Sequence, residues 1–128
     1  MKVRAVFRPG PITAGAVEDL TQAACRMGFH GVGALLVVEN GAPVGILTER
    51  DILRAVAGGA DPSTAIVVRY MSPDPVTVSV DAEISEAAAT MLRIGARHLP
   101  VVEDDRVVGM ISARDVLTDE VRSEEGRR

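Results

Sequence analysis

The sequence has few aromatic residues, a single cysteine and no tryptophan. Its aromatic side chains are two phenylalanines and one tyrosine, so it lacks the stacking platforms on which single-stranded nucleic acids bind. The net charge of −4 gives no broad attraction for DNA or for an anionic membrane. The lone Cys25 excludes an internal disulfide. We therefore expect a protein that binds neither nucleic acid nor membrane.

Long apolar runs are also missing. No stretch approaches the roughly 18 residues that cross a bilayer, and the start MKVRAVFRPGP lacks the apolar segment of a signal peptide. A cytoplasmic location is therefore expected. What is present is a 128-residue chain with 47% hydrophobic and 25% charged residues, typical of a compact globular unit. Its core must consist of Val, Ile, Leu, Ala and Met.

The chain repeats itself after a shift of 64 residues, without a gap. In this alignment Gly45 matches Gly109, and the segment ILTERDIL matches MISARDVL. Two copies at this period predict a pseudo-symmetric pair in which each half buries what the other leaves exposed. The boundaries expected from the sequence are a first repeat at 3–58, a connector at 59–66, a second repeat at 67–120 and a frayed charged tail at 121–128.

Each copy predicts the order strand, helix, strand, strand, helix. Alternating valines at 76–80 indicate a short strand, after which Asp81 is expected to cap a helix. Asn40-Gly41 between two apolar runs is typical of a tight hairpin turn. Gly58 and Gly59 are expected to end the last helix of the first copy.

A hydroxyl residue followed three positions later by an aspartate occurs in both copies, as Thr48/Asp51 and Ser112/Asp115. One interpretation is a capping box at a helix start. The other is a ligand site, because a carboxylate accepts hydrogen bonds from ribose hydroxyls and a helix N-terminus attracts phosphate. The two roles can coexist, and duplication would copy a cap as faithfully as a site.

These motifs resemble the cystathionine-β-synthase (CBS) domain in its tandem form, the Bateman module. The resemblance rests on GVGALLVVENGAPVGILTERDIL in the first copy, and on MSPDPVTV and IGARHLPVVEDDRVVGMISARDVL in the second. It implies an α/β (α+β) fold of two β-α-β-β-α repeats with small packed sheets. It also implies two clefts that bind AMP, ADP, ATP or another adenosyl compound, and a homodimer of pairs.

By this resemblance each cleft mixes residues of the two copies. The residues of the first cleft are Thr48, Asp51, Val76, Thr77, Ala96, Arg97 and His98. Those of the second cleft are Ile12, Thr13, Val32, Gly33, Ser112 and Asp115. Arg97 and His98 are candidate phosphate donors, whereas the matching positions in the first copy are Gly33 and Ala34. The second cleft is therefore expected to bind more weakly. Alternatively, Arg97 forms a surface ion pair with Asp104 or Asp105, and His98 is a structural histidine.

Catalytic and metal interpretations have little support. No nucleophile has an evident base, and His30, His98 and Cys25 lack the spacing of metal ligands. We therefore expect no enzymatic activity, no metal and no required cofactor. The function expected is a stand-alone regulatory module that binds an adenosyl ligand and signals to an unknown protein partner. The alternative is a ligand-free scaffold of the same fold.

A homodimer is expected from apolar positions on the predicted closing helices. Ile52 and Leu53 in the first copy, and Val116 and Leu117 in the second, are predicted to have no partner within one chain. Large exposed apolar patches are rare on monomers.

Overall fold

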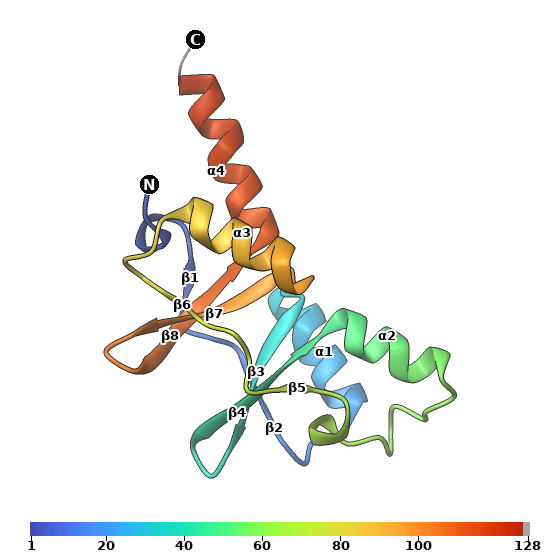
Figure 1. Ribbon diagram of the computed structural model, residues 1–128. Coiled ribbons are helices and arrows are strands. Elements are labelled where there is room, and N and C mark those ends of the chain that lie inside the picture. Colours follow the sequence, from blue (N-terminus) through green and yellow to red (C-terminus); the bar gives the residue numbers. More distant parts are fainter. Residues whose placement is uncertain (127–128) are drawn as a thin grey trace. The chain divides into compact units, whose positions relative to one another are not determined.

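The computed structural model of the chain describes residues 1–126, which form two compact units (Figure 1). Unit 1 contains residues 1–11 together with the chain from Val76 onward, and unit 2 is Ile12–Pro75. Each unit consists of a four-stranded sheet and two α-helices. The mixed α+β class and the repeated arrangement predicted from the sequence are confirmed.

The sheet of unit 2 has the strand order β2-β3-β4-β5. Its strands are β2 (Thr13–Gly15), β3 (Ala34–Glu39), β4 (Ala42–Thr48) and β5 (Ser72–Pro73). The sheet of unit 1 has the order β1-β8-β7-β6. Its strands are β1 (Arg8–Pro9), β6 (Val78–Ser79), β7 (His98–Glu103) and β8 (Arg106–Ser112). In each sheet one edge strand, β2 or β6, runs parallel to its neighbour and the other pairings are antiparallel.

Two helices pack on each sheet. Their bounds are α1 (Leu20–His30) and α2 (Glu49–Ala57) in unit 2, and α3 (Ile84–Ile94) and α4 (Ala113–Gly126) in unit 1. Short 3-10 helices cover Val3–Ala5 and Val67–Arg69. In unit 1 the last turns of α4 project beyond α3 and the sheet (Figure 1). The helices bury one apolar side each, as their sequence periodicity requires.

A strand from outside each hairpin completes each sheet. In unit 1, β1 from the start of the chain pairs with β8, with Pro9 opposite Gly109. In unit 2, β5 pairs with β4, with Pro73 opposite Gly45. A Cβ at Gly45 would lie 2.6 Å from the sulfur of Met71, and one at Gly109 would overlap the Arg8 carbonyl and the Phe7 ring. The repeated glycine is therefore required for the close approach of the added strand.

Each unit has its own aliphatic core. Unit 2 buries Leu20, Leu35, Val37, Leu47 and Val67 among others. Unit 1 buries Val3, Val80, Leu99, Val101 and Ile111 among others. Val3 comes from the start of the chain, so unit 1 needs these N-terminal residues for its core as well as for its sheet.

The turns follow the sequence closely. Asn40 and Gly41 connect β3 to β4 with φ values of 51° and 78°. Asp104 and Asp105 take the same left-handed conformation between β7 and β8, with φ values of 51° and 62°. Such positive values are typical of two-residue hairpin turns. Gly58 follows α2 directly, so the predicted helix end is confirmed.

Asp81 does not cap α3, which corrects the prediction. The residue before the helix is Glu83, and no side chain caps its N-terminus. Asp81 lies too early in the turn, where its N–H donates to the Ser79 hydroxyl at 3.1 Å. Its carboxylate instead accepts a hydrogen bond from Arg4 at 3.2 Å. The acid therefore anchors the N-terminal segment of unit 1.

The C-terminal segment is helical where the sequence predicts a frayed tail from 121. Helix α4 continues to Gly126, because neither Gly nor Pro interrupts it earlier and its Glu and Arg residues favour helix. Residues 127–128 of the predicted tail lie outside the described part of the chain.

The predicted apolar surface needs a further correction. Val116 is only 7% exposed and belongs to the core of unit 1, and Ile52 packs against the core of unit 2. The neighbouring Leu53 and Leu117 are 67% and 60% exposed, as expected.

Candidate functional site

The turn from β4 into α2 forms a complete capping box. The Thr48 N–H donates to Oδ2 of Asp51 at 2.8 Å, and the Asp51 N–H donates to Oγ1 of Thr48 at 3.2 Å. The capping interpretation is therefore confirmed in the first copy. A carboxylate has two oxygens, and Oδ1 of Asp51 accepts no hydrogen bond from the rest of residues 1–126. The cap therefore leaves acceptor capacity for a ligand.

The turn from β8 into α4 repeats this geometry. The Ser112 N–H donates to Oδ2 of Asp115 at 2.8 Å, and the Asp115 N–H donates to Oγ of Ser112 at 3.1 Å. Both aspartates are half-buried at the N-terminus of a helix. Each unit thus presents a fixed carboxylate beside a hydroxyl.

In unit 2 the first-copy candidates gather around this turn. The Glu49 N–H donates to the Gly33 carbonyl at 3.0 Å, so Gly33 and the half-buried Val32 lie beside Thr48. The Leu36 N–H donates to the Ile12 carbonyl at 3.0 Å, which places Ile12 and Thr13 at the start of β2 next to β3. We call this group of residues the unit 2 edge: Ile12, Thr13, Val32, Gly33, Thr48 and Asp51.

In unit 1 the second-copy candidates gather in the same way. The Ala113 N–H donates to the Arg97 carbonyl at 2.8 Å, and His98 lies opposite Ser112 in the β7–β8 ladder. The preceding Ala96 is fixed by its N–H bond to the Met91 carbonyl at 3.0 Å. We call this group the unit 1 edge: Val76, Thr77, Ala96, Arg97, His98, Ser112 and Asp115.

Residues assigned to different clefts are neighbours within one unit. Gly33 lies next to Thr48, and His98 lies opposite Ser112, although the sequence assigns the members of each couple to different clefts. The combination of Asp51 with Arg97, and of Asp115 with Thr13, stays a prediction from the sequence.

Arg97 is exposed and forms no ion pair with Asp104, Asp105 or any other acid within residues 1–126. The surface-pair alternative for this residue is therefore wrong. Its guanidinium remains available to a phosphate, which Arg binds through two parallel hydrogen bonds. The matching position of unit 2 is Gly33, so the two edges differ in charge.

Sequence reasoning missed one ion pair that contacts the unit 2 edge at the Thr13 carbonyl. Arg26 of α1 contacts Glu18 through two hydrogen bonds of 2.8 and 2.7 Å. The hydrogen bonds from Arg26 lower the pKa of the Glu18 carboxyl; partial burial opposes them, and a bond from the Gly15 N–H assists them. The repeat gives no support for this pair, because the second copy has Ala82 and Thr90 at the matching positions.

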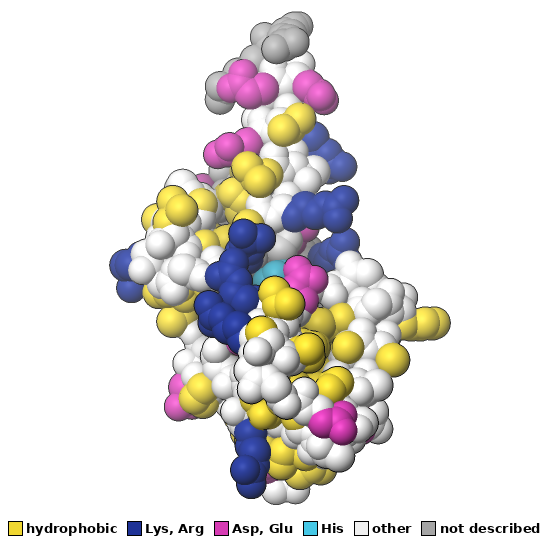
Figure 2. Space-filling model, turned by 90° about the vertical axis from the view of Figure 1, so that its right-hand side faces the viewer, with side chains coloured by type: hydrophobic (Ala, Val, Ile, Leu, Met, Phe, Trp, Pro, Cys, Tyr) yellow, Lys and Arg dark blue, Asp and Glu magenta, His cyan; other side chains and the backbone are white. Residues whose placement is uncertain are grey.

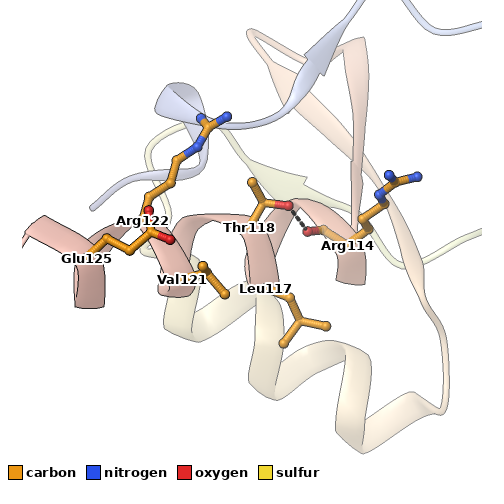
Figure 3. A pocket seen from close by; sticks show the side chains of 6 residues that line it. All are labelled: Arg114, Leu117, Thr118, Val121, Arg122 and Glu125. Carbon is orange, nitrogen blue, oxygen red and sulfur yellow. Dashed lines mark hydrogen bonds between the residues drawn. The ribbon is translucent and has the colours of Figure 1, made fainter.

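A shallow hollow lies elsewhere, along the projecting part of α4. Figure 3 shows Leu117 and Val121 directed to one side of the helix and the guanidinium groups of Arg114 and Arg122 directed to the other. Its lining residues are Arg114, Leu117, Thr118, Val121, Arg122 and Glu125. The space-filling view also shows hydrophobic side chains among basic and acidic ones on this helix (Figure 2). The hollow shares no residue with either edge.

Within residues 1–126, no three His, Cys, Asp or Glu side chains lie close enough together to hold a metal ion. None of the described helices is long and apolar enough to cross a membrane.

The repeated fold, with the same capped turn from strand to helix in each copy, defines a tandem pair of α+β repeats. The family model of the CBS domain matches residues 3–58 and 67–121, so the chain belongs to the CBS domain family.

Among curated relatives, an uncharacterized protein of Methanopyrus kandleri is 35% identical over 120 residues, which cover 91% of this chain and 61% of that protein. The chain thus spans about three-fifths of this relative's length.

Solved structures share the whole fold. The CBS domain pair of protein MJ0100, in complex with 5-methylthioadenosine and S-adenosyl-L-methionine, matches with a TM-score of 0.86 and 27% identity, covering 94% of this chain and 99% of that one. The CBS domain protein PAE2072 from Pyrobaculum aerophilum, complexed with AMP, matches with a TM-score of 0.81 and 26% identity, covering 95% and 99%.

Proposed function

We propose that this CBS pair is a regulatory module that binds adenosyl compounds through the residues of its two edges and passes the occupancy to a protein partner. The observation that carries the proposal is the duplicated capped carboxylate. Asp51 and Asp115 each commit Oδ2 to a cap and keep Oδ1 for a ligand. The AMP and S-adenosyl-L-methionine complexes of the two similar structures support an adenosyl ligand.

Each part of the ligand has a matching group. The free oxygen of Asp51 or Asp115 accepts hydrogen bonds from the ribose hydroxyls. Thr48 and Ser112 stand at helix N-termini, where backbone N–H groups and the dipole favour phosphate. The half-buried Ile12 and Val32 provide an apolar contact for the base.

The two sites differ in the strength of phosphate binding. Following the pairing predicted from the sequence, Asp51 shares its ligand with Arg97 and His98, whereas Asp115 shares its ligand with Thr13 and Gly33. A guanidinium donates two charge-assisted hydrogen bonds that a glycine lacks. AMP and ATP therefore bind more tightly at the Asp51 site.

Signalling requires that the ligand bind two states of the protein with different affinities. A homodimer offers such states as alternative arrangements of its subunits. The exposed apolar residues support self-association: Leu53 and Val56 on α2 are 67% and 49% exposed, and Leu117 and Val121 on α4 are 60% and 57% exposed. We include this dimer in the proposal.

A ligand-free scaffold is the second candidate. It is favoured by the capping boxes themselves, which already give Thr48, Asp51, Ser112 and Asp115 a structural role. Thermal unfolding separates the candidates, because a ligand at a hundredfold excess over its Kd stabilises the folded state by about 2.7 kcal/mol. AMP, ATP or S-adenosylmethionine is expected to raise Tm by several degrees, with guanosine as the control. No shift with any adenosyl compound at millimolar concentration supports the scaffold and contradicts ligand binding.

A further inference from the structure

The Glu18–Arg26 ion pair distinguishes unit 2 from unit 1. Its two parallel hydrogen bonds join both guanidinium nitrogens Nη1 and Nη2 to both carboxylate oxygens. The side chains are only 23% and 32% exposed, so water competes with them less than at an open surface. Ala82 and Thr90 occupy the matching positions in unit 1 and cannot form such a pair.

The ion pair also holds the backbone of β2. Nη1 of Arg26 donates to the Thr13 carbonyl at 3.0 Å, and the Gly15 N–H donates to Oε1 of Glu18 at 2.5 Å. The Ile12 carbonyl accepts from the Leu36 N–H, and the Ala16 N–H donates to the Val38 carbonyl, so the even-numbered residues face β3. Because successive residues of a strand point their polar groups to opposite sides, Thr13 and Gly15 face the open edge of the sheet. The pair therefore satisfies two otherwise open groups of β2.

Thr13 and Ile12 belong to the unit 2 edge, so this contact affects the proposed ligand site. Strand β2 has three residues and a neighbour on one side only. Fixing the backbone of one residue costs about 1–2 kcal/mol of conformational free energy. A segment that is ordered before the ligand arrives does not add this cost to binding.

We propose that Glu18 and Arg26 are positioning residues that fix Ile12 and Thr13 in their binding conformation before the ligand arrives. The inference rests on the proposed function. In unit 1, Ala82 and Thr90 at the matching positions give the Thr77 segment no such ion pair. The site that contains Thr13 thus gains its affinity from a backbone that is ordered before binding, and not from a phosphate-binding arginine. Its ligand class is an adenosyl compound without phosphate.

Adenosine is the probe, since it carries no phosphate for Arg97. The test compares Arg26→Met and Glu18→Gln with a matched pair in unit 1, Arg4→Met and Glu103→Gln, which breaks the 2.6 Å contact between Arg4 and Glu103. All variants also carry Asp51→Asn, so that the Thr13 site alone remains. Calorimetry is expected to give about three- to tenfold weaker adenosine binding for the first pair. Binding by the matched pair stays within about twofold at a similar loss of Tm.

The result that overturns the inference is unchanged adenosine affinity in Arg26→Met at a lowered Tm, since the ion pair is then only structural. Hydrogen exchange of the ligand-free protein gives a second readout: Arg26→Met is expected to accelerate exchange of the Gly15 amide. An unchanged exchange rate of the Gly15 amide contradicts the proposal that the ion pair orders β2 before binding. If wild-type protein binds neither adenosine nor AMP, the proposed function fails and the inference with it; AMP binding with normal adenosine affinity in Arg26→Met refutes the inference alone.

Discussion

Thr48 and Asp51 exchange two hydrogen bonds across the first turn of α2, of 2.8 and 3.2 Å, and so fix each other's side chains. The same exchange joins Ser112 to Asp115. A ligand that uses the second carboxylate oxygen thus meets a group whose orientation is already set. The cap and the ligand contact are compatible in this geometry. Mutations can separate these two roles of the aspartate.

Asp51→Ala and Asp51→Asn are expected to differ in stability but not in ligand binding. An asparagine keeps one oxygen for the cap on the Thr48 N–H, while its amide NH₂ replaces the ribose acceptor. Alanine loses both functions and about 1 kcal/mol of unfolding free energy. Denaturant unfolding measures the first effect and AMP titration the second. Normal AMP affinity in Asp51→Asn contradicts the ribose role.

Gly109→Ala is expected to destabilise unit 1. The added Cβ meets the Arg8 carbonyl and the Phe7 ring, so β1 must move away from β8. Overpacking of this kind costs roughly 1–3 kcal/mol. The control is Gly28→Ala in α1, where nothing lies within 4 Å of the new Cβ and alanine favours the helix by about 0.5–1 kcal/mol. Equal stability of the two variants in urea would refute the close approach.

The Glu18–Arg26 pair predicts a specific acid sensitivity. Because the folded-state pKa of Glu18 is lowered, the pair stabilises the protein fully above the unfolded-state pKa of this carboxyl. This contribution is lost as pH falls through the folded-state pKa. The stability difference between wild type and Glu18→Gln is therefore expected to be largest near neutral pH and to shrink on acidification. A difference that is constant with pH contradicts the charged pair.

Dimer formation is expected to depend on the exposed apolar side of α4. The double variant Leu117→Ser/Val121→Ser replaces two apolar side chains that are 60% and 57% exposed. It leaves the core residue Val116 unchanged. Sedimentation is expected to show a shift from dimer to monomer, while circular dichroism stays unchanged. A control at the exposed Val17 of unit 2, Val17→Ser, should leave the dimer intact. A wild-type monomer at tens of micromolar contradicts the proposed assembly.

Local features of this fold could be predicted from the sequence. The Asn40-Gly41 turn and the Thr48 capping box depend on residues that are at most three positions apart. The recurrence of the Thr48/Asp51 motif as Ser112/Asp115 after 64 residues then indicated the family, because two copies in register are far more specific than one.

Contacts between distant segments could not be predicted in the same way. The sequence shows that Gly45 and Gly109 occupy matching positions. Why glycine is needed there depends on strands from distant parts of the chain, such as β1, which places Pro9 opposite Gly109. Val116 and Leu117 are equally apolar, and one step of about 100° around a helix buries the first and exposes the second. The site residues were found through their repeats, whereas Glu18 and Arg26 occur in one copy only.

The most direct test of ligand binding is a calorimetric titration of AMP into wild-type protein and into the double variant Asp51→Asn/Asp115→Asn. The variant keeps an oxygen for each cap and loses the ribose acceptor in both units. We predict saturable binding below millimolar concentration for the wild type and none for the variant, at similar Tm values. Identical titration curves for the two proteins, or no binding by the wild type, would contradict the proposal that these carboxylates hold an adenosyl ligand.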